Sequence, residues 1–121
     1  MPTFNAALAV PVYGSGMSGQ LFNNEAGAAG TASQSLQYQR LNGQNTNKVW
    51  GCRWATPPTS AQVDLQCSMT NVDADFQSIL TFSFSSTGEA PNQFEQGPST
   101  YYRYKVISNT GGSGLTTPFQ F

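Results

Sequence analysis

The chain has 121 residues, of which 38% are hydrophobic and only 9% are charged, and its formal net charge is −1. This length fits one domain with a single modest core, and eight Phe, five Tyr and two Trp residues suffice to anchor it, which argues against intrinsic disorder. A near-neutral charge offers no electrostatic attraction to nucleic acid or to an anionic membrane. Because proteins near zero net charge tend to associate, the composition favours a subunit of an assembly, with a homo-oligomer expected.

Residues 1–34 are predicted to form an extended N-terminal arm that docks on neighbouring subunits. Glycine is too frequent in this segment for a helix, since each one costs about 1 kcal/mol against alanine. Its apolar residues lie in short clusters, for which a solvated tail, the alternative, would have no use. The predicted partner-binding residues of this arm are Phe4, Leu8, Val10, Val12, Tyr13, Leu21 and Phe22.

Two strands are predicted after the arm. The first covers residues 35–41, and the second covers 48–54, where Trp50, Cys52 and Trp54 share one face. A connection containing two prolines follows. The second strand is therefore expected to pair antiparallel with the strand that comes next.

The centre of the chain, residues 62–84, has the pattern of a β-hairpin. Apolar and polar residues alternate from Gln62 to Met69, which predicts a strand with one buried face that includes Met69. A polar turn over 70–75 then leads to a second strand that begins at Phe76.

The last third of the chain predicts a loop over 85–99 with Phe94 as its lone apolar anchor, then a strand over 100–107. A final short strand over 115–121 is expected at an edge or an end, because it contains Pro118. Short strands separated by turns, without a helical period, predict an all-β fold. The expected architecture is a small β-sandwich or jelly-roll domain over residues 35–121, preceded by the extended N-terminal arm.

Cys52 and Cys67 are the only cysteines. The first residues lack the basic region of a secretory signal, and no stretch approaches the roughly 20 apolar residues of a membrane span. We therefore expect synthesis in a cytoplasm, where buried thiols are more common than disulfides. A bridge between the two cysteines is the alternative.

Two segments of the chain carry a resemblance to a known class of protein. VDLQCSMTNVDADFQSI, and later YYRYKVISNTGG followed by a terminal strand, resemble a β-sandwich module of bacteriophage virion proteins. The resemblance covers residues 62–121, with Thr70-Asn71 standing where the module usually has Asp-Gly and Phe76 where it usually has Trp. It implies a galactose-binding-like or jelly-roll sandwich of the kind found in head decoration proteins, fibres and adaptors.

No catalytic residue, cofactor or metal site is predicted, and the chain is expected not to be an enzyme. The sequence has no His, which removes the commonest general base and the usual nucleophile pairs. Asp73 and Asp75 could act as paired carboxylates or bind Ca²⁺, but ordinary turn chemistry accounts for them, and a calcium loop has a more regular ligand spacing. Arg103 and Lys105 are expected to be solvated charges, because nucleic-acid recognition requires a denser basic stripe.

Carbohydrate binding is the main alternative function. Exposed aromatic rings can stack on sugars, and amide side chains can bond hydroxyl groups. Phe94 and Tyr101 are candidate aromatic residues, and one of the two tryptophans, Trp50 or Trp54, would be a further candidate if it were exposed. Trp50 and Trp54 are assigned to the core, because strand alternation most often reflects a buried face.

The resemblance and the arm together predict a phage virion structural protein, specifically a capsid decoration or cement protein. It would be made in the host bacterial cytoplasm and located in the virion. Its expected partners are the major capsid protein and copies of itself, bound through apolar contacts of the arm and the sandwich, with no nucleic acid and no membrane. The alternatives are a glycan-binding module of a fibre or polysaccharide-active assembly, and a neck or tail adaptor.

Overall fold

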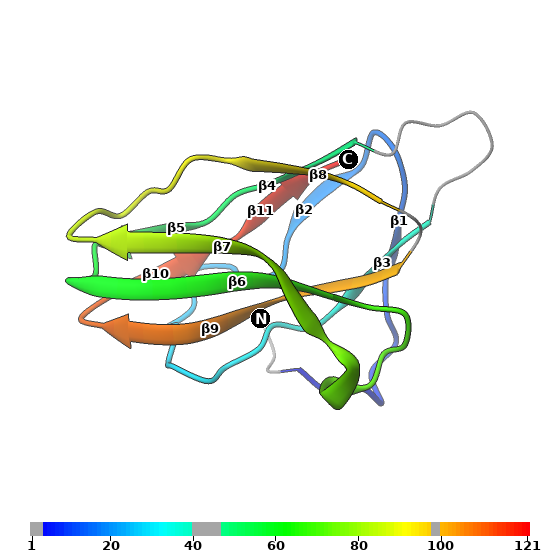
Figure 1. Ribbon diagram of the computed structural model, residues 1–121, viewed down its shortest axis with the longest axis horizontal. Helices are drawn as coiled ribbons and strands as arrows, with labels where there is room; N and C mark the ends of the chain where they lie inside the picture. The colour runs from blue at the N-terminus through cyan, green and yellow to red at the C-terminus, as the bar shows by residue number, and fades with distance from the viewer. Residues whose placement is uncertain (1–3, 40–46, 98–99) are drawn as a thin grey trace.

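The structure, a computed structural model, describes residues 4–39, 47–97 and 100–121. Within these ranges the chain forms two packed β-layers without an α-helix, which confirms the predicted all-β sandwich. Figure 1 shows β6, β7 and β9 lying in front of β4, β11 and β2. A short 3-10 turn, η1 (Asp73–Asp75), connects β6 to β7.

The first sheet has five strands in the order β1, β3, β9, β6, β7. Their bounds are β1 (Val12–Tyr13), β3 (Leu36–Tyr38), β9 (Thr100–Thr110), β6 (Ser60–Ser68) and β7 (Gln77–Ser85). β6 pairs antiparallel with both β9 and β7, and the register with β7 shifts after Leu65. The predicted hairpin over residues 62–84 is therefore confirmed. Met69 follows the end of β6 and is 92% exposed, so the buried face ends earlier than predicted.

The second layer is a sheet of four strands in the order β2, β11, β4, β8. Their bounds are β2 (Ser18–Gln20), β11 (Pro118–Gln120), β4 (Asn47–Trp50) and β8 (Gln93–Gln96). A short antiparallel pair, β5 (Arg53–Thr56) with β10 (Ser113–Thr116), follows β4 and precedes β11 along the chain. Pro118 is the first residue of β11, as its missing N–H requires, but β11 lies inside the sheet rather than at its edge.

The core between the two layers is largely aromatic. Trp50 lies in it with the Tyr102 and Phe119 rings at centroid distances of 5.0 and 5.9 Å. Burying one such side chain contributes roughly 1.5–3 kcal/mol. Completely buried members include Leu36, Tyr38, Trp50, Val63, Leu65, Tyr104, Val106 and Leu115. Trp54 is also buried, so the assignment of both tryptophans to the core is confirmed.

The predicted pairing of the Trp strand with the next strand is wrong. The predicted strand divides into β4 and β5 at Gly51–Cys52, and these pair with β11, β8 and β10. The proline-containing connection crosses from one layer to the other, so Trp50 and Leu65 are buried in one core from opposite sheets. Apolar alternation cannot distinguish two strands that pair from two strands that face each other.

The loop predicted over 85–99 contains β8, which the sequence did not reveal. Phe94 lies on this strand and is 73% exposed, so it is not an apolar anchor. β9 is longer than predicted and reaches Thr110. Arg40 and Leu41, at the end of the strand predicted over 35–41, lie outside the described residues.

The segment preceding residue 35 contributes to both layers. β1 pairs in parallel with β3, and β2 pairs with β11. Leu21 and Phe22 are buried in the core. Gly27 has a φ of +70°, and a Cβ added there would come within 2.5 Å of the Trp54 ring, so this part of the segment packs closely on the sandwich. The division into an arm over 1–34 and a domain over 35–121 stays a prediction, with these contacts joining the two.

Candidate functional site

The outer face of β2, β11, β4 and β8 carries two rows of residues that cross the four strands. Opposed residues of antiparallel strands point to the same side of a sheet, so the register defines both rows. The first row is Ser18, Gln120, Val49 and Phe94. The second row is Gln20 and Pro118, continued by Gly51 and Asn92, which lie one residue beyond the paired residues Trp50 and Gln93. We call these eight residues, none of them charged, the amide face.

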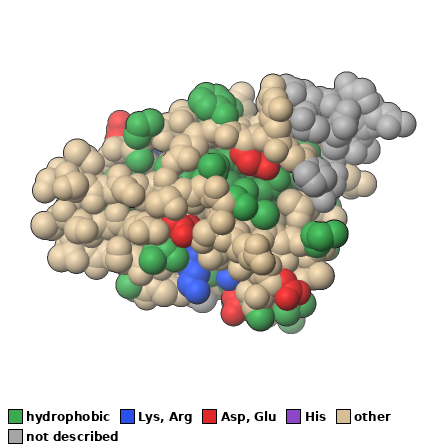
Figure 2. Space-filling model, in the orientation of Figure 1, with side chains coloured by type: hydrophobic (Ala, Val, Ile, Leu, Met, Phe, Trp, Pro, Cys, Tyr) green, Lys and Arg blue, Asp and Glu red, His purple; other side chains and the backbone are tan. Residues whose placement is uncertain are grey.

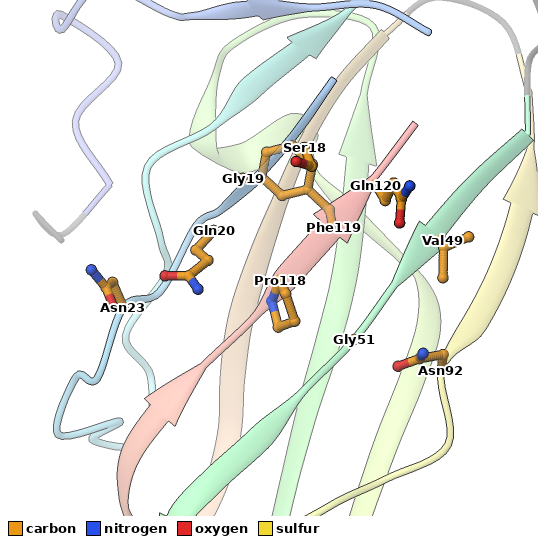
Figure 3. A pocket seen from close by; sticks show the side chains of 10 residues that line it. All are labelled: Ser18, Gly19, Gln20, Asn23, Val49, Gly51, Asn92, Pro118, Phe119 and Gln120. Atoms are coloured by element: carbon orange, nitrogen blue, oxygen red, sulfur yellow. The ribbon is translucent and has the colours of Figure 1, made fainter. Parts of the chain in front are cut away.

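A groove of about 640 Å³ lies over the amide face. Figure 3 shows Gln20 and Asn23 on one side of Pro118, with Val49 and Asn92 on the other. The floor is low because Gly51 has no side chain: a Cβ there would lie 3.0 Å from Pro118 and 3.1 Å from the Asn92 amide oxygen. The groove therefore has a small apolar floor and amide walls.

The floor of the groove is held from the core side. The buried Tyr104 hydroxyl donates a hydrogen bond of 3.0 Å to the Gly51 carbonyl, and the Gly51 N–H donates one of 2.9 Å to the Pro118 carbonyl. Burial raises the pKa of the Tyr104 hydroxyl, which therefore stays a neutral donor. These bonds fix the backbone beneath the groove.

The amide side chains of the groove have no hydrogen-bond partner in the protein. Across the described parts of the chain, Gln20, Asn23, Asn92 and Gln120 make no side-chain hydrogen bond. By contrast, the neighbouring Gln93 amide, which points inward, donates to the Thr81 carbonyl at 2.6 Å. The groove thus presents four amides with free donors and acceptors.

A second hollow continues the amide face toward Phe94. It has a volume of about 450 Å³, and Val49 lines both hollows. Val49 and Phe94 are directly opposed on β4 and β8, so the exposed ring lies at the end of the first row. Of the two aromatic candidates for sugar stacking, Phe94 is exposed and Tyr101 is half-buried on β9 of the other sheet.

The open edge of β7 is a second surface available for binding. Among the described strands, β7 has a neighbour on one side only, and it contains neither a charged residue nor proline. The Thr81 carbonyl accepts the Gln93 amide and so points away from β6. By strand alternation the backbone groups of Ser83 and Ser85 also point to the open edge.

An apolar hollow of about 610 Å³ lies beside this edge. Met69 and Ile79, both exposed, line it together with Cys67 and Tyr102. Figure 2, which views the molecule as in Figure 1, shows green hydrophobic patches among mostly neutral polar atoms, with few charged side chains. The β7 edge and this hollow together form the second candidate binding surface, which we call the β7 edge surface.

The predicted partner-binding residues divide into three groups. Leu8 and Val12 are 43% and 49% exposed. Phe4, Val10 and Tyr13 are half-buried. Leu21 and Phe22 are buried in this chain's own core, so neither side chain is available to a neighbouring subunit, and the prediction is corrected for these two. Their apolar character serves intramolecular packing.

Arg103 was expected to be solvated, but it is only 2% exposed. Its guanidinium lies 4.6 Å from the Phe4 ring centroid and 4.2 Å from that of Phe76. It donates to the Gln66 amide oxygen at 2.9 Å and to the Asp73 carboxylate at 2.6 Å. The hydrogen bond and charge of Arg103 lower the pKa of Asp73, and Asp73 is therefore part of a structural ion pair.

Lys48 is buried in a second ion pair. Its Nζ lies 3.2 Å from the Glu95 carboxylate and 4.3 Å from the centroid of the Tyr38 ring. The Tyr102 hydroxyl donates to the same carboxylate at 3.1 Å, and its pKa is raised by burial and by Glu95. These contacts fix β8 against β4 and β9.

The two cysteines are free thiols in the structure. Burial raises the pKa of Cys52, and burial together with the Glu95 carboxylate raises that of Cys67. A thiol with a raised pKa is a poor nucleophile at neutral pH. Across the described ranges, no three His, Cys, Asp or Glu side chains are placed to hold a metal ion.

A scan against protein-family models and a search of curated proteins both find no match to this chain. No helix within the described residues is long and apolar enough to cross a membrane. Function is therefore inferred from two surfaces: the amide face, which has no charged residue, and the β7 edge surface, whose mainly apolar hollow is bordered by Asp75 and Glu95.

Proposed function

We propose that this chain is a bacteriophage virion structural protein, a decoration protein that binds the major capsid protein on the outside of the head shell. The observation that carries the proposal is the unpaired, uncharged edge of β7 beside an apolar hollow. An extended segment of the shell subunit would add to the sheet at this edge, and its apolar side chains would enter the hollow.

Strand addition suits the chemistry of β7. Main-chain hydrogen bonds supply affinity, while a neighbouring pocket selects side chains of the added strand. Soluble proteins usually protect an open edge with charges or proline, and β7 has neither. Among the described residues, the Gln93 amide bonds to the Thr81 carbonyl at this edge, and an incoming strand would displace it.

The exposed residues of the N-terminal segment would supply a second contact. Leu8 and Val12 expose apolar side chains, and β1, which contains Val12, lies at the opposite edge of the same sheet. A small sandwich with contacts at both edges of one sheet could bridge neighbouring shell subunits. Each contact would be modest, at roughly 25 cal/mol per Å² of apolar area buried, and repeated over many copies.

Two lysines on the β7 edge test the proposal. Particles from a phage that lacks the gene are mixed with purified protein, and the bound fraction is measured by co-sedimentation. Wild-type protein should bind to saturation, and Ser83→Lys with Ser85→Lys should bind at least about tenfold more weakly, because edge lysines oppose strand pairing. Ala29→Lys in an exposed turn adds a charge elsewhere and should bind like the wild type.

The outcomes separate the candidate roles. Failure of the wild type to bind, or undiminished binding by the edge variant, would contradict the proposal. Saturation at about a dozen copies would instead indicate a neck or tail adaptor, because a symmetric shell offers far more equivalent sites than a single vertex does. Thermal unfolding of the variants should match that of the wild type, since both serines are exposed.

A further inference from the structure

We propose that the groove on the amide face binds a neutral oligosaccharide. Four amide side chains line it, all of them without partners in the described protein, around a floor of Gly51 and Pro118. The lining of this groove shares no residue with the β7 edge surface, although Gln93 and Glu95 of β8 lie beside that edge. Glycan binding at this groove can therefore be tested independently of the proposed role in the shell.

The hydrogen-bonding chemistry of the groove matches hydroxyl groups. Each amide offers two N–H donors and a carbonyl acceptor in one plane, and neighbouring sugar hydroxyls can both accept and donate. Gln20 and Asn23 lie on one side of Pro118, Gln120 lies on β11, and Asn92, just before β8, lies on the other side (Figure 3). A ligand lying across the strands would meet amides at both sides.

The lack of charged side chains in the groove selects against anionic ligands. None of its ten lining residues is charged, so phosphate, sulfate or carboxylate groups gain no ion pair there. A protein partner would favour a centre rich in aromatic residues, Met or Arg, and the groove has none of these exposed. A polar ligand without charge is the class that remains.

The apolar surfaces of the amide face suit the faces of sugar rings. Pro118 forms the floor of the groove, and Val49 connects the groove to the exposed Phe94 ring. A chain of sugars could lie from Gln20 across Pro118 and Val49 and place one ring on Phe94. The groove and the neighbouring hollow, which share Val49, therefore point to an oligosaccharide rather than a monosaccharide.

A glycan array carrying neutral, sialylated and sulfated oligosaccharides tests the inference, followed by calorimetric titration with the strongest neutral ligand. We expect saturable binding of neutral glycans that changes little with salt concentration, since no ion pair is involved. Asn92→Ala with Gln120→Ala should weaken binding at least about tenfold, which corresponds to the loss of about one net hydrogen bond. Phe94→Ala should weaken binding of longer oligosaccharides more than that of disaccharides.

Gln39→Ala with Gln77→Ala is the matched control, because it removes two exposed amides outside the groove. This control should bind like the wild type, and side-chain amide NMR signals of Gln20 and Asn92 should shift when the glycan is added. The inference is overturned if no neutral glycan binds saturably or if anionic glycans bind better. It is also overturned if the groove variant binds as tightly as the control.

Discussion

Arg103 joins three parts of the chain that are far apart in the sequence. Its guanidinium lies against the rings of Phe4 and Phe76, which contact each other edge to face, and it bonds to Gln66 and Asp73. A planar guanidinium can stack on rings and donate in its own plane at the same time, which an ammonium cannot. The residue thus ties the N-terminal segment and the turn after β6 to the middle of the first sheet.

Arg103→Lys should therefore be much more harmful than a conservative exchange at the surface. We expect the free energy of unfolding to fall by about 2 kcal/mol, because the charge stays buried while hydrogen bonds and ring contacts are lost. Urea denaturation measures this change. Arg53→Lys on the exposed side of β5 is the control and should stay within about 0.5 kcal/mol of the wild type. Equal effects of the two exchanges would show that the buried contacts of Arg103 are unimportant.

The Arg103–Asp73 pair should make stability depend on pH at the acidic end. Arg103 lowers the pKa of Asp73 from its usual value of 3.8, so the folded protein holds this carboxylate ionised at a pH where the unfolded chain protonates it. The pair therefore stabilises the fold above the unfolded-state pKa, and the contribution is lost as the pH falls through the lowered folded-state pKa.

Asp73→Asn should remove this contribution. Because the Asp73 side chain is largely exposed, solvent screens the pair, and the variant should lose only about 1 kcal/mol near neutral pH. The difference from the wild type should shrink toward zero as the carboxyl group becomes protonated. Denaturation at a series of pH values measures it, and a difference independent of pH would argue against the ion pair as its cause.

Among the elements, β2 and the residues after it join the segment predicted as an arm to the sandwich. Removing residues 1–24 would delete β1 and β2 and expose the core at the sites of Leu21 and Phe22. Losing these two side chains alone should cost about 3–6 kcal/mol, at roughly 1.5–3 kcal/mol each. We expect the truncated protein to unfold at a clearly lower urea concentration, and an unchanged midpoint would contradict the structure.

Surface substitutions separate binding from folding in the same segment. Leu8→Ser with Val12→Ser changes two exposed side chains and should leave the urea midpoint nearly unchanged. In the particle-binding assay this variant should bind more weakly than the wild type. If this variant bound as well as the wild type, Leu8 and Val12 would not contact the shell, and the proposed contact would be limited to the β7 edge.

Alternation predicted the elements well where a strand has one apolar face and a long run, as in β6, β7 and β9. It failed for β8, because Phe94 points outward and Gln93 points into the sandwich, the reverse of the usual pattern. It also could not identify pairing partners, which depend on the path of the connections between layers. Pro57 and Pro58 lie where the chain crosses from one layer to the other. In the sequence, however, proline indicates only that strand pairing stops, not where the next strand goes.

The amide face could not be predicted, because its members come from four segments and meet only through the strand register. Gln20 and Asn92 are ordinary polar residues in the sequence, and nothing local distinguishes them from the bonded amide of Gln93. Phe94 was the one member of the amide face that the sequence indicated as a candidate for ligand binding. Buried charges were missed for a similar reason: Arg103 alternates as a solvent-facing residue, and its cover comes from the distant residues Phe4 and Phe76.

At the scale of the whole molecule, the fold leaves even fewer charged side chains at the surface of a chain that has few. Lys48 and Arg103 are both buried, so two of the five basic residues are withdrawn from solvent. Such a surface gives little electrostatic repulsion between molecules and suits a protein that functions while bound to other subunits. The amide face lies on the outer side of the four-stranded sheet and the β7 edge surface follows an edge of the five-stranded sheet, which would let one hold the shell while the other stays free.

The number of copies per phage particle tests the central claim most directly. Quantitative mass spectrometry of purified particles, with the major capsid protein as internal standard, gives this ratio. A decoration protein follows the symmetry of the shell, so we predict on the order of hundreds of copies per particle. Absence from the particles, or a count of about a dozen or fewer, would contradict it.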